Sequence, residues 1–348
     1  MLRNISSINK LQINCKTIAQ NYELLKGMVG SDVICASNLK SNAYNLGAIP
    51  IMHCLSKAGC SKFFVSNLQE ALELRGASLT DEIYVLNGIF SDEEDLFAQN
   101  NIIPVLNNVE QFELYNNFCK RKNKRFSAAL NVDNDNNMVG LSYGDTLELA
   151  EKNYFNQKVN IKFIMSYFSN DKKNNVEYHN QQLKNMSKLR QVFAKPVSLA
   201  NSAAIILGKE YYFDMVRMGL ILFGITKEDI FDLKNAISLT SRIIHLSEFN
   251  EPKIIARIPI GYGDGILSSL AHKGVFYIHG YPAPVLKVLM DYTMLDVSNV
   301  PDDFLYSGVE VEIIGKNSTV NKIAMAAEVS ITNVIVSLSP RIQRTYLQ

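Results

Sequence analysis

The sequence has few of the residues from which metal sites and disulfide frameworks are usually built. Its 348 residues include no tryptophan, five histidines and five cysteines, and no two cysteines form a CxxC pair. An odd cysteine count without such a pair favours neither a disulfide framework nor a zinc site. The histidines show no HxH or HExxH spacing, so we expect no bound metal ion. The cysteines are Cys15, Cys35, Cys54, Cys60 and Cys119, and the histidines are His53, His179, His245, His272 and His279.

Charge and hydropathy exclude further classes of function. The 35 basic and 34 acidic residues give a net charge of +1, and there is no basic tract typical of nucleic-acid binding. Apolar runs stay far below the ~20 residues of a membrane span. The N-terminal segment MLRNISSINKLQINCK lacks the apolar core of a signal peptide. We therefore expect a soluble, cytoplasmic protein with no nucleic-acid or membrane partner.

From residue 32 to about residue 225, short apolar runs alternate with amphipathic stretches. The patterns at 68–76, 109–123 and 176–193 predict helices with one buried face, and Ser91 before DEED predicts a helix N-cap. This alternation predicts a (β/α)8 barrel. A doubly wound sheet lacks support because no GxGxxG follows any strand. The candidate strands are 32–39, 62–67, 82–88, 102–107, 127–133, 160–167, 196–200 and 214–218.

After about residue 235 the pattern changes to short β-branched runs separated by Gly, Pro, Asn and Asp, which predicts a mainly β domain. We therefore expect a barrel over residues 12–230 and a β domain over residues 235–348, with residues 1–11 packing with the latter as one option. The strand-like segment LQINC, residues 11–15, could join either domain.

Lys40 follows the first barrel strand, with Tyr44 four residues later. In barrel enzymes the carboxyl ends of the strands carry the catalytic groups. A lysine with a desolvated stem has a lowered pKa and can form a Schiff base. The alternative is an ordinary surface lysine in a polar loop.

The loops after the seventh and eighth strands read SLANSAA (198–204) and VRMGLILFG (216–224), and both contain small residues. Small residues let main-chain N–H groups approach an anion, and Ser202 adds a hydroxyl at a predicted helix start. A reactive lysine together with two phosphate-binding loops indicates pyridoxal phosphate (PLP). The alternative for ANSAA is a plain N-cap. The other polar residues at strand ends are Asn87, Asn107, Asp133, Tyr167, Asn201 and Arg217.

Two motifs in the β domain also stand out. Tyr262 lies between glycines in IPIGYGDGI (258–266), so its phenol is expected to be accessible. Met290 and Asp291 begin MDYTMLDV (290–297) on a predicted loop or strand edge. The alternatives are a hairpin turn with a chance tyrosine and a simple strand start.

Taken together and in this order, these segments resemble alanine racemase of the PLP-dependent type that joins a barrel to a β domain. The resemblance spans nearly the whole chain and implies a homodimeric enzyme that interconverts L-alanine and D-alanine and supplies D-alanine for peptidoglycan. The matching segments are LKSNAYNLG (39–47), FFVSNLQEALELRG (63–76), NVDNDNNMVGL (131–141), IMSYFSND (164–171), ANSAA (200–204), DMVRMGLILFG (214–224), IPIGYGDG (258–265), LMDYTMLDV (289–297) and LSPRIQRTY (338–346).

The resemblance implies a role for each site residue. Lys40 would bind PLP covalently and act as one base, and Tyr262, from the second subunit of a head-to-tail dimer, would be the opposed base. Arg217 would face the pyridine nitrogen. Met290 and Asp291 would line the substrate pocket, and the remaining cofactor-binding residues would be Tyr44, Asn201, Ser202, Gly219 and Leu220.

Several positions depart from the family pattern. Met138 falls where the family has the arginine that binds the substrate carboxylate, and Asn131 falls on the modified lysine that supports it. Tyr167 and Ser198 replace histidines, and Thr332 replaces a phosphate-binding tyrosine.

These departures leave three hypotheses open: an alanine racemase with a rewired pocket, a racemase of another small amino acid such as serine, and a catalytically degenerate PLP-binding homologue. A cation that replaces the lost arginine would favour an enzyme. Lys162 and Arg257 are candidates near predicted strands.

Overall fold

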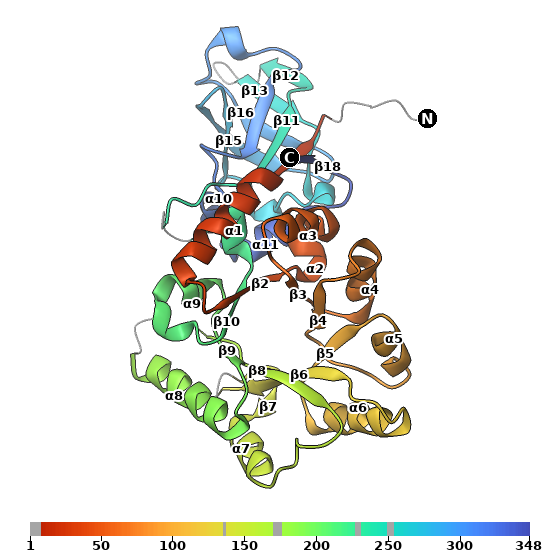
Figure 1. Cartoon of the computed structure of the whole chain (residues 1–348). Coiled ribbons are helices and arrows are strands. Elements are labelled where there is room, and N and C mark those ends of the chain that lie inside the picture. The colour runs from red at the N-terminus through yellow and green to blue at the C-terminus, as the bar shows by residue number, and fades with distance from the viewer. Residues whose placement is uncertain (1–7, 135–136, 170–175, 227–230, 249–253) are drawn as a thin grey trace. The chain divides into compact units, whose positions relative to one another are not determined.

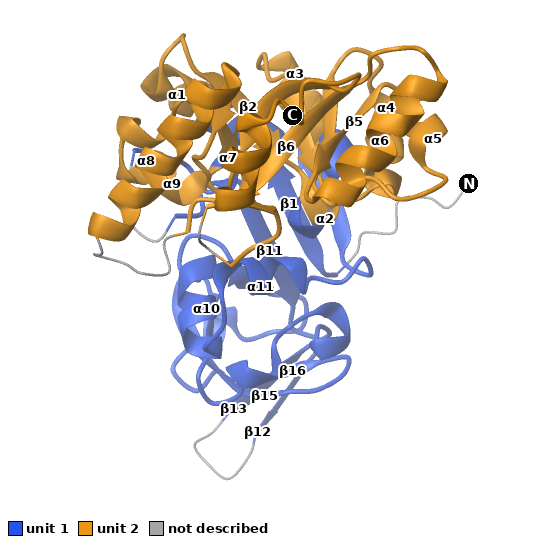
Figure 2. Ribbon diagram, turned by 90° about the horizontal axis from the view of Figure 1, so that it is seen from below, with its two compact units in different colours: residues 1–21, 43–50, 222–348 blue, residues 22–42, 51–221 orange. Residues whose placement is uncertain are grey.

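The computed structural model describes residues 8–134, 137–169, 176–226, 231–248 and 254–348 (Figure 1). The chain forms two compact units (Figure 2). Residues 22–42 and 51–221 form one, called here the barrel unit. Residues 1–21, 43–50 and 222–348 form the other, called here the β unit.

The barrel unit contains a parallel sheet in the order β10-β2-β3-β4-β5-β6-β8-β9, with β7 paired to β6. Main-chain bonds from Asp214 to Val197 (3.2 Å) and from Arg217 to Ala200 (2.9 Å) link β10 to β9 and nearly close the sheet. The predicted (β/α)8 barrel is confirmed, and each predicted strand contains an observed one. The strands are β2 (Ile34–Asn38), β3 (Lys62–Val65), β4 (Glu82–Val85), β5 (Ile102–Leu106), β6 (Ser127–Asp133), β7 (Leu141–Ser142), β8 (Asn160–Met165), β9 (Val197–Ser198) and β10 (Met215–Met218).

Helices lie around the outside of this ring of strands (Figure 1). The Asn67 and Asn108 side chains follow β3 and β5 and cap α4 and α6 by accepting the N–H groups of Glu70 and Gln111. The helices predicted at 68–76, 109–123 and 176–193 are confirmed. The helices are α1 (Cys15–Val29), α2 (Lys40–Asn45), α3 (Ala48–Lys57), α4 (Leu68–Ala77), α5 (Glu94–Gln99), α6 (Val109–Arg121), α7 (Tyr143–Glu151), α8 (Val176–Phe193) and α9 (Ser202–Leu207).

The predicted N-cap at Ser91 is wrong. Helix α5 begins at Glu94, and the residue before it, Glu93, makes no side-chain cap bond. Asp92 has a φ of +72°, a left-handed conformation that breaks the chain direction between Ser91 and the helix.

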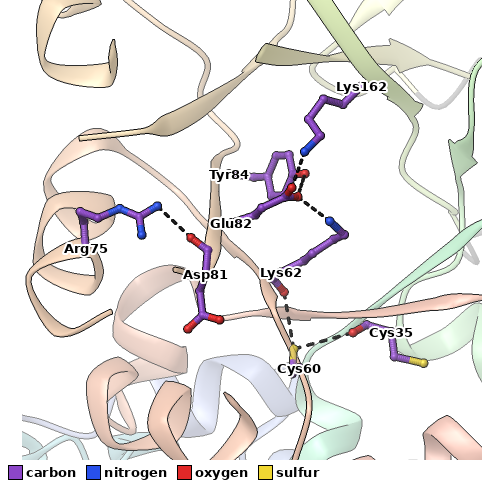
Figure 3. Close-up of polar contacts among 8 residues, drawn as sticks. All are labelled: Cys35, Cys60, Lys62, Arg75, Asp81, Glu82, Tyr84 and Lys162. Carbon is purple, nitrogen blue, oxygen red and sulfur yellow. Dashed lines mark hydrogen bonds and ion pairs between the residues drawn. The ribbon is translucent and has the colours of Figure 1, made fainter. Parts of the chain in front are cut away.

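The interior of the barrel is filled by side chains. Phe64, Tyr84 and Phe163 pack with ring centroids 4.8–6.2 Å apart. At the amino ends of their strands, Lys62 and Lys162 both pair with Glu82, which also accepts the Tyr84 hydroxyl (Figure 3). In barrels of this kind a site forms at the carboxyl ends of the strands.

The β unit contains a sheet in the order β12-β13-β16-β15-β14-β17-β11-β1-β18. Its pairs are antiparallel except β1 with β18, so the predicted mainly β domain is confirmed. The LQINC segment joins this unit through β1, which pairs with β11 and β18. The strands are β1 (Lys10–Asn14), β11 (Ile237–Arg242), β12 (His245–Glu248), β13 (Ile254–Ile258), β14 (Val275–Ile278), β15 (Tyr281–Val288), β16 (Thr293–Asp296), β17 (Glu310–Ile314) and β18 (Gln343–Leu347), with helices α10 (Val320–Ala327) and α11 (Ile331–Val336).

Within the described ranges, the structure contains no helix that is both long and apolar enough to cross a lipid bilayer.

Candidate active site

Lys40 lies directly after β2, at the start of a left-handed turn. Residues Ser41–Asn45 all have φ between +52° and +65°, a conformation that costs L-residues roughly 1–2 kcal/mol each. The Asn38 side chain accepts the Lys40 N–H (3.2 Å), and Glu70 of α4 accepts the Asn42 N–H (3.2 Å). Strain of this kind persists only where the surroundings hold it, and it is concentrated at functional sites.

The environment of Lys40 favours its neutral amine. Burial is the main cause that lowers the pKa of Lys40, the positive charge of Arg217 lowers it further, and Glu70 partly opposes both. A neutral amine is the form that attacks a carbonyl. Lys40 is therefore suited to covalent attachment of an aldehyde.

Arg217 lies on β10, the neighbour of β2 in the sheet. Its guanidinium donates to the main-chain carbonyls of Ser166 and Leu199. Burial lowers the pKa of Arg217 to about 10. Among the described residues, no carboxylate is paired with this buried cation. It is therefore available to a polar or anionic group of a ligand.

The two predicted phosphate loops meet in the barrel unit. The Gly219 N–H donates to the Ser202 hydroxyl (3.1 Å), and Leu220 begins the short helix η2 (Leu220–Phe223). The Asn201 side chain is the N-cap of α9, since it accepts the N–H groups of Ala203 and Ala204 (3.0 and 3.1 Å). Asn201 thus shapes the loop through its cap, and its contact with a cofactor stays a prediction.

These barrel-unit residues fit PLP. They provide an amine of lowered pKa, a buried guanidinium with no carboxylate partner in the described part of the chain and two loops joined by the bond from Gly219 to Ser202. The buried hydroxyls of Ser37 and Ser166 have no hydrogen-bond partner among the residues that the structure describes. Ser37 lies on β2 and Ser166 directly follows β8, so both orphaned hydroxyls are close in sequence to the carboxyl ends of barrel strands. Buried orphans of this kind cost about 1–3 kcal/mol each.

The predicted β-unit residues form a second group. The N–H groups of Tyr262 and Gly263 donate to the carbonyls of Leu289 and Met290, each at 2.8 Å. A Cβ at Gly261 would lie 2.1 Å from the Leu289 oxygen, so only glycine allows this approach. The structure thereby joins two separate sequence motifs, with the Tyr262 and Met290 side chains 52% and 58% exposed.

Tyr44 and Asp291 belong to the same unit. Tyr44 is buried, and its ring packs edge-on against Phe223 with centroids 6.2 Å apart. Asp291 is exposed beside Met290. Thr332 lies in α11.

The positions that depart from the family pattern are mostly neutral or engaged elsewhere. The Asn131 amide donates to the Asn107 side chain (2.9 Å) and the Val139 carbonyl (2.6 Å). The Met138 side chain is half exposed. Ser198 donates to the Met215 carbonyl (2.8 Å), and the half-exposed Tyr167 follows β8.

Neither candidate replacement cation is free. Lys162 pairs with Glu82 at the amino end of β8, and Arg257 bonds to His245 and Ser247 within the β unit. These contacts do not support either residue as the replacement for the lost arginine.

Three residues at these sites were not predicted. Glu70 holds the Lys40 turn, and the N-x-x-E spacing from Asn67 is a signal that could have found it. Asp264 and Arg341 form an ion pair beside Tyr262. No local pattern joins these two residues, because they are far apart in the sequence.

The chain matches known proteins along nearly its whole length. The family model described as the alanine racemase N-terminal domain matches residues 13–227, and that of the alanine racemase C-terminal domain matches residues 244–346. The chain is 31% identical to an alanine racemase of Rickettsia akari, over 98% of this chain and 100% of the relative. It is also 31% identical to one of Rickettsia rickettsii, over 98% and 99%.

Solved structures of alanine racemases are also similar to this chain. An alanine racemase of Bartonella henselae with covalently bound pyridoxal phosphate has a TM-score of 0.90 and 31% identity, over 97% of this chain and 99% of that chain. The biosynthetic alanine racemase of Pseudomonas aeruginosa has a TM-score of 0.89 and 24% identity, over 98% and 99%. The second likeness concerns the fold alone.

Proposed function

The chain belongs to the alanine racemase family, and we propose that it carries out the PLP-dependent interconversion of L-alanine and D-alanine with Lys40 and Tyr262 as its two bases. The observation that carries this proposal is the environment of Lys40. The lysine follows a barrel strand, begins a strained left-handed turn and has a pKa lowered by burial and by Arg217.

Racemisation removes the α-proton from one face of the amino acid and returns a proton to the opposite face. A single base cannot easily serve both faces, so a lysine and a tyrosine on opposite sides are a suitable pair. The Lys40 amine exchanges a proton at one face and the Tyr262 phenol at the other. When bound, PLP withdraws electrons from the α-carbon and makes its proton acidic.

The residues assigned to the cofactor are those that the sequence motifs indicate. Lys40 would bind it covalently. Arg217, whose pKa near 10 keeps it charged at neutral pH, would interact with its pyridine ring. The residues assigned to its phosphate and its immediate surroundings are Tyr44, Asn201, Ser202, Gly219 and Leu220.

The substrate pocket is lined by Met138, Met290 and Asp291. Because Met138 and Asn131 are neutral, the substrate carboxylate loses a charge-assisted hydrogen bond of roughly 1.5–3 kcal/mol. This loss corresponds to about 10- to 100-fold in affinity. We therefore expect a functional racemase with weakened alanine binding.

The enzyme acts as a homodimer in which each site takes Tyr262 from the partner subunit. The half-exposed phenol of Tyr262 supports this arrangement. We further propose that the enzyme works in the cytoplasm and that its D-alanine enters peptidoglycan.

The test is conversion of L-alanine to D-alanine by the purified protein with added PLP, with Lys40→Ala as control. Conversion that depends on Lys40 is expected. If the wild-type protein showed the absorption band of lysine-bound PLP but converted serine and not alanine, the substrate assignment would be wrong. If it converted neither, the chain would be a PLP-binding homologue without racemase activity.

A further inference from the structure

Tyr262 has a fixed backbone and an accessible side chain. It lies in a short turn, residues 261–265, called here the tyrosine turn. The turn is closed by main-chain bonds from Gly265 to Tyr262 and from Ile266 to Gly261, each at 3.1 Å. The Tyr262 ring is 52% exposed. Its position therefore depends on the groups that hold the turn.

The carboxylate of Asp264 is the main polar group inside this turn. Its side chain is 6% exposed, and one oxygen accepts the Gly261 N–H at 3.0 Å. This bond joins the residues on the two sides of Tyr262. The Asp264 carbonyl also accepts the Ser339 N–H at 2.9 Å, which ties the turn to the segment after α11.

Arg341 lies at the end of that segment and approaches the turn from outside. Its Nε lies 3.4 Å from the second oxygen of Asp264, and its side chain is 63% exposed. A Cβ placed on Gly263 would lie 3.1 Å from Arg341 Nη1, so the guanidinium passes close to the residue that follows Tyr262. Without Arg341, the buried carboxylate would lose its cationic partner.

A second contact fixes the same segment on the other side of the turn. The Ser337 hydroxyl donates to the Gly265 carbonyl at 3.0 Å. Gly265 has a φ of +96°, and a Cβ there would lie 2.0 Å from the main-chain carbonyl oxygen of Ser337. Segment 337–341 is thus packed closely against the turn, and Arg341 adds the charged contact.

We propose that Asp264 and Arg341 are a positioning pair for Tyr262, which set the placement of its phenol for proton transfer without touching the substrate or the cofactor. This inference rests on the proposed role of Tyr262 as a base. Misplacement of a catalytic group by about 1 Å can cost on the order of 100-fold in rate. Loss of the pair therefore slows proton transfer at the Tyr262 face and leaves the Lys40 face unchanged.

The test follows exchange of the α-proton with deuterated water, starting from L-alanine and from D-alanine separately. The PLP-loaded wild type is compared with Arg341→Ala, Arg341→Lys, Asp264→Asn and Tyr262→Phe. Lys273→Ala, which breaks the exposed ion pair of Lys273 with Glu328 in the same unit, is the matched control. The absorption band of lysine-bound PLP is recorded for every variant.

Arg341→Ala and Asp264→Asn are expected to slow exchange from one enantiomer on the order of 10- to 100-fold and to leave the other enantiomer and the absorption band unchanged. Arg341→Lys should recover part of the loss, and Lys273→Ala should have no effect. Equal slowing from both enantiomers, or no slowing, would overturn the positioning role. Because Arg341 is exposed, its variants keep the test decisive even if Asp264→Asn does not fold.

Tyr262→Phe separates this inference from the proposed function. If Tyr262→Phe loses exchange from one enantiomer and Arg341→Ala exchanges both enantiomers at the wild-type rate, only the positioning pair is rejected. Normal exchange from both enantiomers in Tyr262→Phe rejects Tyr262 as a base, and the pair then has no catalytic group to position.

Discussion

Lys40 begins α2 just after β2, and Arg217 lies on the neighbouring strand β10. The influence of Arg217 on Lys40 has a measurable consequence. Burial and the charge of Arg217 both lower the pKa of Lys40, so its reactive neutral form is present at lower pH than for an ordinary lysine, whose pKa is ~10.4. Attachment of PLP to the apoenzyme should therefore have its pH midpoint below that value.

Replacement of Arg217 by Met removes the like charge and should shift this midpoint to higher pH. The measurement is the rate at which the absorption band of lysine-bound PLP appears as a function of pH. Arg190→Met is the control, because Arg190 is exposed and pairs with Asp214. Equal midpoints in wild type and Arg217→Met would show that Arg217 does not influence Lys40.

The neutral pocket residues lead to a prediction for substrate affinity. Met138→Arg places a cation where the substrate carboxylate is expected. A hydrogen bond to a charged group contributes roughly 1.5–3 kcal/mol, so the KM for alanine should fall about 10-fold or more. Met138→Leu is the apolar control. An unchanged KM in Met138→Arg would remove Met138 from the substrate pocket.

At the scale of the element, the left-handed turn of α2 carries strain that glycine would relieve. Ser41 is exposed within it, with φ at +54°, so Ser41→Gly should stabilise the protein by about 1 kcal/mol. The matched control is Ser187→Gly on an exposed face of the right-handed helix α8, which should destabilise by roughly 0.5–1 kcal/mol. The free energy of unfolding in urea is measured for both variants. If both variants were destabilised, the turn of α2 would not be strained at Ser41.

A second element-scale prediction concerns Glu82 at the amino end of the barrel. Burial raises the pKa of Glu82, but hydrogen bonds from Lys162, Lys62 and Tyr84 overcome this and hold the pKa at about 2. Because the folded pKa lies below the unfolded value of ~4.3, the stabilisation is complete above that value and is lost as pH falls toward about 2.

The difference in unfolding free energy between wild type and Glu82→Gln should therefore shrink as pH falls from ~4.3 toward ~2. Glu23→Gln, on the exposed face of α1, serves as control. A difference that stays constant over this range would show that Glu82 does not titrate as described.

At the scale of the whole molecule, most of the architecture could be predicted from the sequence. Regular apolar runs mark the eight barrel strands, and Lys40 could be placed at a strand end because an apolar segment stops there. The left-handed turn after Lys40 could not be predicted, since SNAYN contains no glycine to indicate positive φ.

The pairing of Lys162 with Glu82 was also not predicted. The register between β6 and β8 is irregular near Ala128 and Leu130, and such irregularities redirect side chains without a sequence signal.

Contacts between residues far apart in the sequence also limited the prediction of the site. The catalytic role of Tyr262 stays a prediction from its glycines and from the family resemblance. The contacts that hold it involve Leu289, Met290 and Arg341 and could not be predicted. Such contacts depend on how distant segments pack. The division at residues 12–230 and 235–348 stays a prediction.

The most direct test of the account mixes two inactive chains. Lys40→Ala and Tyr262→Phe each lack one base, so each alone should fail to convert L-alanine to D-alanine. In a homodimer with shared sites, a mixed dimer regains one intact site, and random reassembly should restore about a quarter of the wild-type activity. Wild-type turnover by Tyr262→Phe alone, or a mixture that stays inactive although mixed dimers have formed, would contradict a racemase whose two bases come from two subunits.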